Sequence, residues 1–142
     1  MSLAYNLANK DSQILTSSHL LFVILDEFEN YIKDIFRGLN PNINILKNSL
    51  KLVLADVKQS NQNKDIDESI IKLFSKSEFL AKKNNDQVIT LEIILLSFTY
   101  INNHEKDILS SQGITSENLL VEIKKFRQGK KAMDNQAESS FN

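Results

Sequence analysis

Few residues in this chain of 142 could perform chemistry. There is no cysteine, and neither a glycine-rich phosphate loop nor a nucleophile elbow occurs. His19 stands beside Leu20 and Leu21 in the first turn of an expected helix, where a capping or packed histidine is favoured over a catalytic base. His104, the other histidine, falls in a polar turn and is expected at the surface. The sequence therefore predicts no catalytic residue and no metal site, and it favours a binding module over an enzyme.

The charged residues also give a weak signal. A basic cluster near the C-terminus comprises Lys124, Lys125, Arg127, Lys130 and Lys131. A nucleic-acid patch is one interpretation, but cations also complement the negative end of a helix, and the net charge of the chain is only -1. A solvated helix end is therefore favoured. Asp86 and Glu92 flank an expected loop, and composition alone predicts a helix cap and a solvated charge for them.

The composition is that of an ordinary soluble domain. Hydrophobic residues make up 42% and charged residues 25%, and the length suits one domain with a proper core. The longest apolar stretch, residues 20–25, is far too short to cross a bilayer, and the N-terminus has no signal-peptide pattern. We therefore expect no membrane partner and a cytoplasmic location, with which the absence of cysteine is compatible.

The pattern of apolar residues predicts an all-α fold. Three glycines and one proline leave little room for hairpins, and nearly every apolar run has helical spacing. Thr16 and Thr90 stand before two such runs, so we expect them to cap helices over residues 17–29 and 91–101. A shorter helix is expected after each, at residues 31–37 and 105–111.

A fourth helix is expected in each half of the chain. Asn40 and Pro41 are expected as the cap and first helical residue of one, and Thr115 or Ser116 opens the other. Gly113 is expected in the link before the last helix, and Gly129 is expected to end that helix.

The two halves of the chain repeat each other. Leu7-Ala8 recurs as Leu80-Ala81, and Lys33-Asp34-Ile35 recurs as Lys106-Asp107-Ile108, both at an offset of 73 residues. Two copies at this spacing predict a pseudo-twofold tandem repeat of two four-helix units. We assign residues 1–58 to the first repeat, 59–66 to a linker, 67–128 to the second repeat and 129–142 to a polar interdomain linker. Because few residues precede Leu7, we expect the chain to begin inside its first helix.

The order of these motifs resembles the N-terminal domain of the Clp chaperone ATPases. The matching residues are Leu7-Ala8, Gln13-Ile14-Leu15-Thr16-Ser17-Ser18-His19-Leu20-Leu21, Asp34-Ile35-Phe36, Ala81-Lys82, Asp86, Ile89-Thr90-Leu91-Glu92, Ile108-Leu109 and Gln112-Gly113-Ile114. The ending, from Ile123 through Glu138, looks like the ClpB disaggregase branch, in which such a stretch leads into the first ATPase module. The resemblance implies two four-helix units in one domain, which agrees with the repeat.

The resemblance implies a substrate-binding role without catalysis in these residues. Asp86 and Glu92 match exposed acidic positions at the rim of a groove for unfolded or aggregated polypeptides, and Phe74, Leu80 and Ile93 match its apolar positions, although a place in the core is an open alternative for these three. Lys76 stands where the family often has an apolar residue, which would narrow the groove or favour more acidic clients.

The resemblance also implies partners and cofactors for a longer protein. No Walker motif occurs here, so no cofactor is expected in this chain, whereas ATP and Mg are implied for the full-length protein. A homohexamer is implied for that protein, with a co-chaperone system as a possible partner, and a monomer or weak dimer is expected for this chain alone. Two alternatives stay open: an adaptor-docking N-domain of a protease-associated Clp unfoldase, and a helical regulatory domain that binds nucleic acid through residues 124–131.

Overall fold

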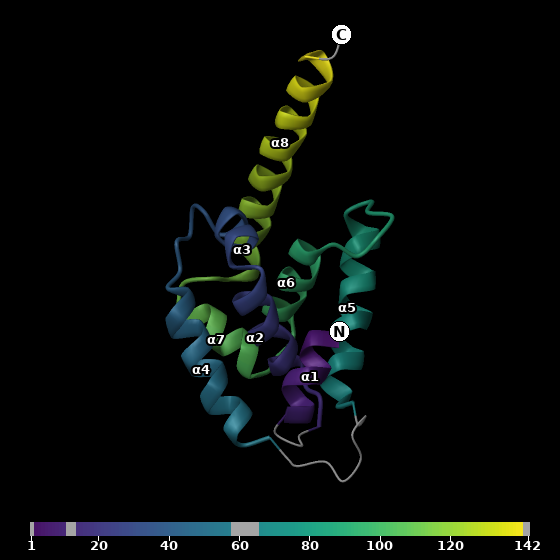
Figure 1. Cartoon of the computed structure of the whole chain (residues 1–142). Coiled ribbons are helices and arrows are strands. Elements are labelled where there is room, and N and C mark those ends of the chain that lie inside the picture. Colours follow the sequence, from purple (N-terminus) through teal and green to yellow (C-terminus); the bar gives the residue numbers. More distant parts are fainter. Residues whose placement is uncertain (1, 11–13, 58–65, 141–142) are drawn as a thin grey trace.

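Helices account for the secondary structure of the chain. The computed structural model describes residues 2–10, 14–57 and 66–140. Within those ranges the helices, in chain order, are α1 (Ser2–Lys10), α2 (Ser17–Glu27), α3 (Glu29–Ile35), α4 (Ile43–Ala55), α5 (Glu68–Lys83), α6 (Leu91–Tyr100), α7 (His104–Ser111) and α8 (Ser116–Ser140) (Figure 1). The only extended pairing among the described residues is one isolated bridge between Leu15 and Ile66. Most of the expected linker 59–66 lies outside the described residues.

The helices form two units of four, α1–α4 and α5–α8. In the first unit α2 packs on α1, α3 and α4, and in the second unit α6 packs on α5, α7 and α8 in the same order. Helices of the two units also pack against each other: α4 packs on α7, and α3 packs on α8. The third helix of each unit thus packs on the fourth helix of the other, which is the arrangement that a twofold axis between two copies produces. The expected all-α fold with a pseudo-twofold tandem repeat is confirmed.

One apolar core joins both units. The core residues of the first unit include Leu21, Leu25, Ile32, Phe36, Leu46 and Leu50, and those of the second include Leu73, Ile93, Leu95, Phe98, Leu109 and Leu119. In both units the central helix lies at the middle of this core, and α2 and α6 are buried along much of their length. Each unit therefore covers apolar surface that the other could not bury alone.

The two central helices begin at equivalent threonines, as the sequence predicted. The Thr90 hydroxyl accepts a bond from the backbone N–H of Ile93 at 3.4 Å. Thr16 uses a different partner, because its backbone N–H donates to Nδ1 of His19 at 3.0 Å. His19 is fully buried, so the expectation of a capping, packed histidine is confirmed. His104 is exposed at the start of α7, also as expected.

The start of α4 differs from the prediction. Asn42, not Asn40, is the N-cap, and its side chain accepts from the backbone N–H of Ile45 at 3.1 Å. Asn40 has φ 46, a left-handed conformation, and its N–H donates to the Phe36 carbonyl. An N-cap needs extended backbone, whereas left-handed asparagine suits the end of a helix, so Asn40 closes α3 instead. Pro41 lies in the link.

The end of the last helix also differs from the prediction. Gly129 does not stop α8, which continues to Ser140 and projects away from the rest of the domain (Figure 1). A glycine inside a helix costs about 1 kcal/mol relative to alanine, and continued backbone hydrogen bonding outweighs that cost here. The residues expected as a polar linker are therefore helical up to Ser140. Gly113, with φ 80, does end α7 as expected.

Candidate functional site

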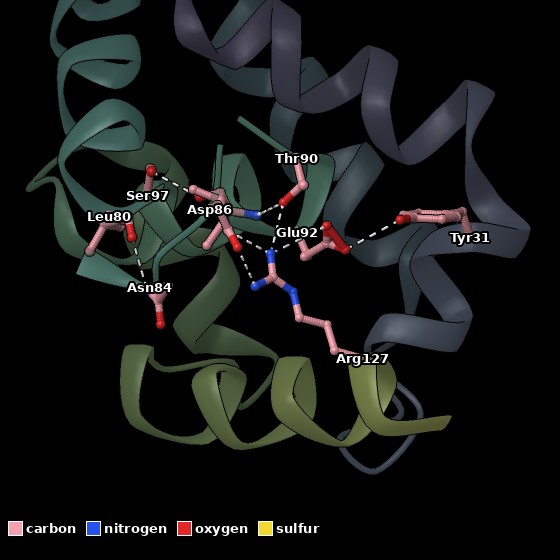
Figure 2. A network of polar contacts seen from close by, with 9 residues as sticks. Tyr31, Leu80, Asn84, Asp86, Thr90, Glu92, Ser97 and Arg127 are labelled. Carbon is pink, nitrogen blue, oxygen red and sulfur yellow. Dashed lines mark hydrogen bonds and ion pairs between the residues drawn. The ribbon is translucent and has the colours of Figure 1, made fainter. Parts of the chain in front are cut away.

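Arg127 is the centre of a polar network that joins four parts of the fold. From α8, its guanidinium donates to both carboxylate oxygens of Asp86, at 2.9 and 2.8 Å, and to the Thr90 hydroxyl at 3.1 Å. One of its nitrogens also lies 3.8 Å from the Glu92 carboxylate. On the far side of Glu92, the Tyr31 hydroxyl of α3 donates to the same carboxylate at 3.2 Å (Figure 2).

Local structure fixes the acidic members of this network. Asp86 lies in the turn between α5 and α6, where its backbone N–H donates to the Ala81 carbonyl at 2.8 Å. Asn85, with φ 61, supplies the left-handed residue that this turn needs. Glu92 lies in the first turn of α6, where the helix dipole favours a carboxylate. The loop and the helix start therefore present both carboxylates toward α8.

Burial strengthens these contacts. The side chains of Asp86 and Glu92 are 16% and 5% exposed, and that of Arg127 is 32% exposed. The hydrogen bond from Arg127 to Asp86 raises the pKa of the guanidinium, so it is charged at every pH at which the fold persists. Burial, and then the negative charge of Glu92, raise the pKa of Tyr31. The expectation that Asp86 and Glu92 are exposed charges is thus wrong: both are largely buried and paired.

The predicted apolar positions are also less accessible than expected. Leu80 and Ile93 are 3% and 1% exposed and belong to the core. Phe74 is half-buried and packs against that core. Leu80 and Ile93 therefore cannot contact a client while this packing persists, because their side chains already fill the space between helices. The structure thus corrects the prediction that they line an open groove.

Accessible apolar surface lies next to these positions. Val88, in the same loop as Asp86, is 69% exposed, and Phe79 on α5 is 58% exposed. The ammonium of Lys76 lies 5.1 Å from the Phe79 ring centre and 4.9 Å from that of Tyr100. Lys76 therefore covers aromatic faces at the position where an apolar residue was expected from the resemblance.

A groove of about 730 Å³ lies between α3 and α8, beside the network. Tyr31 and Phe126 line it, with their rings 5.3 Å apart in an edge-to-face arrangement. Because Tyr31 also donates to Glu92, the groove and the acidic pair adjoin through one side chain. Charged side chains of both signs, including Arg37 and Glu122, stand along the groove. This shape provides an apolar surface with a polar border, an arrangement common to ligand-binding sites in general.

The sequence pointed to Asp86 and Glu92 but not to their partners. Arg127 appeared there only as one cation in a basic cluster, and Tyr31 only as the first residue of an expected helix. The repeat offers one usable signal for Arg127: at an offset of 73 it corresponds to Leu54, so a charge replaces an apolar residue on the stripe that faces the core.

The structure weakens the nucleic-acid interpretation of the basic cluster. Arg127 faces Asp86 and Glu92, and Lys125 lies 3.7 Å from the Glu122 carboxylate. These partners neutralise part of the positive charge on which phosphate binding would depend. Across the described ranges, no three acidic or histidine side chains gather in a way that could hold a metal ion. Within the same ranges, no helix has both the length and the apolarity needed to cross a membrane.

This fold matches a known class of helical domains. The family described as the Clp repeat (R) N-terminal domain matches residues 1–112, and the chain belongs to that family. Among curated relatives, the chaperone protein ClpB of Rickettsia conorii is 32% identical over 139 residues, and that of Rickettsia felis is 33% identical over the same length. Each alignment covers 94% of this chain, which spans 16% of the length of either relative.

A solved structure supports the fold assignment. A chain from preliminary structural investigations of a malarial protein secretion system superposes with a TM-score of 0.71 at 19% identity, and the match covers 89% of each chain. At that identity the likeness concerns the fold alone.

Proposed function

We infer that this domain binds extended segments of unfolded or aggregated polypeptides for a ClpB-like disaggregase. The observation that carries this proposal is the adjacency of an acidic pair, Asp86 and Glu92, to a groove with an aromatic wall formed by Tyr31 and Phe126. Side chains that are buried in folded proteins become exposed on unfolding, and an aromatic groove can accept them without reading a particular sequence.

The chemistry of the site suits weak and reversible capture. An accessible groove gives apolar contact, and the carboxylates of Asp86 and Glu92 beside it can attract lysine and arginine in a client where Arg127 leaves them free. Phe79 and Val88 are further exposed apolar side chains, on α5 and in the Asp86 loop. Of the positions implied by the resemblance, Asp86, Glu92 and the half-buried Phe74 stay in the proposed site, with Leu80 and Ile93 as the packed layer beneath them.

The rest of the proposed assignment concerns a longer protein. Membership of the Clp N-domain family and likeness to ClpB support a homohexamer in which separate modules bind ATP and Mg and drive threading. In that arrangement this domain contributes client capture and no catalytic group. A cytoplasmic location and work alongside a co-chaperone system belong to the same proposal.

Capture of a permanently unfolded protein tests the site. Reduced and alkylated lactalbumin, labelled with a fluorophore, serves as the probe in anisotropy titrations. We expect Asp86→Asn to weaken binding about threefold, the scale of a partly solvated charge contact. Gly129→Gln places a polar side chain at the groove, where a side chain at this position meets open space. It should also weaken binding.

Gly129→Ala is the matched control for the groove variant. It removes the same glycine but leaves the groove open, so capture should equal that of the unaltered chain. If Asp86→Asn and Gly129→Gln both capture the probe normally and melt normally, the proposed site is wrong.

A further inference from the structure

The acidic site is already occupied by a cation of its own chain. Arg127 makes two short bonds to Asp86 and one to Thr90, and it lies beside Glu92, so the strongest positions around both carboxylates are taken (Figure 2). We propose that Arg127 is a specificity-determining residue that acts as an internal competitor: a basic client segment binds the acidic pair only by displacing it. This inference rests on the proposed function.

Geometry makes Arg127 displaceable. Its side chain is 32% exposed, so part of it can be reached from solvent while its guanidinium contacts the carboxylates. It is carried by α8, which packs on α3 and α6 and, beyond Gly129, projects from the domain (Figure 1). Rotation of the side chain would free both oxygens of Asp86 without unpacking Leu80 or Ile93.

Competition sets which clients bind. A neutral apolar segment can use the groove beside Tyr31 and Phe126 while Arg127 stays in place. A lysine-rich segment gains the carboxylates but must break the existing bidentate pair, so its advantage over the neutral segment shrinks. Arg127 therefore lowers the preference of the site for basic segments and keeps apolar content as the main criterion for binding.

Two synthetic peptides of equal length test this selectivity. One alternates leucine with lysine, and the other has glutamine at each lysine position. Affinities are measured by anisotropy for the unaltered chain and for Arg127→Gln. The variant should bind the basic peptide about fivefold more tightly, the effect of releasing one partly solvated ion pair, and the neutral peptide equally well.

Lys72→Gln is the matched control for loss of one positive charge outside the groove. The Lys72 side chain is 63% exposed and lies 3.7 Å from Glu68 on α5, so this variant should leave the ratio of the two affinities nearly unchanged. Arg127→Lys keeps the charge without the bidentate geometry and should give an intermediate ratio, which also covers the case in which Arg127→Gln folds poorly. In NMR spectra of the unaltered chain, the Arg127 Nε–H signal should move on addition of the basic peptide only.

The outcomes separate this inference from the proposed function. If Asp86→Asn weakens binding of the basic peptide but neither Arg127 variant changes the ratio, the site stands and the competition does not. If Asp86→Asn has no effect on either peptide, or if neither peptide binds, the proposed function fails and the inference fails with it. An equal gain for Lys72→Gln and Arg127→Gln would reduce the effect to net charge and overturn the inference.

Discussion

The two repeats have different side chains at equivalent positions near the start of their central helices, α2 and α6. Thr16 and Thr90 occupy the same position, and two residues later the first unit buries Ser18 whereas the second buries Glu92. The first unit needs no opposing charge there, and Leu54 stands where the second unit has Arg127. A common backbone therefore carries neutral residues at these positions in one copy and an ionic network in the other, so the acidic part of the candidate site belongs to the second copy.

A buried ionic network contributes little to the net stability of a fold, so the ionic network of the second unit needs a reason other than stability. Desolvation of Glu92 and Arg127 offsets most of their attraction, so a well-packed neutral pair would stabilise the domain as well or better. The proposed binding role would give the second unit a reason to keep these charges. The predictions below are ordered from the largest expected effect to the smallest.

Ile93→Ala should cause the largest loss. Ile93 is 1% exposed, and removal of its buried methylenes leaves a cavity that costs about 3 kcal/mol in the free energy of unfolding. Urea denaturation measures the change. A loss under 1 kcal/mol would mean that Ile93 is accessible, as the resemblance first implied, and would return it to the groove.

Arg127→Leu should destabilise the domain by about 2 kcal/mol, because it leaves the buried Glu92 without a cation and the partial exposure of Arg127 moderates the cost. The double variant Arg127→Leu with Glu92→Ser gives the second unit the chemistry of the first. It should recover about 1 kcal/mol relative to the single variant. A double-mutant cycle by urea denaturation decides this. Strictly additive losses would show that the two side chains are not coupled.

Thr90→Ala should cost about 1 kcal/mol, the usual value for loss of a helix cap. Thr16→Ala should cost no more, because the backbone N–H of Thr16 keeps its bond to Nδ1 of His19, although the contact of the Thr16 hydroxyl with that nitrogen at 2.9 Å is lost. Thermal melts of both variants compare the caps directly. A larger loss of stability for Thr16→Ala than for Thr90→Ala would contradict this comparison of the two helix caps.

The smallest expected effect is a pH dependence at Asp67, the N-cap of α5. Hydrogen bonding with Ser69 is the main cause that lowers its pKa below the ordinary value. The unfolded chain binds this proton more readily, so the stabilisation is present above a pH of about 4 and is lost as the pH falls through the lowered pKa. Asp67→Asn should flatten the acid limb of a plot of stability against pH. If the loss of stability at acid pH is the same in Asp67→Asn, other carboxyl groups must cause it.

Local patterns made most of the fold predictable from the sequence. The threonine caps, the apolar stripes and the repeat each depend on neighbours within a few residues or on a fixed offset, and these gave the helix order and the two units. Asn40 was misplaced because asparagine suits both a helix start and a left-handed helix end, and only φ distinguishes them. The helix end predicted at Gly129 was wrong because a glycine is compatible with a helix end but does not require one.

The site was less predictable because its contacts are not local. Arg127 and Asp86 are 41 positions apart, and no periodicity relates them. Their pairing depends on how α8 crosses the start of α6, which is a property of the packed core. The acidic residues could be named by resemblance, but their burial and their internal partner could not.

The straight continuation of α8 gives the Arg127 contact a mechanical consequence. A helix has 1.5 Å of rise per residue, so the stretch from Arg127 to Ser140 is a lever about 20 Å long with its pivot at the site. A change of tilt of about 10° at Arg127 would move the far end by about 3 to 4 Å. Any tilt of α8 that accompanied loss of the contact with Asp86 would therefore be magnified along this length of helix.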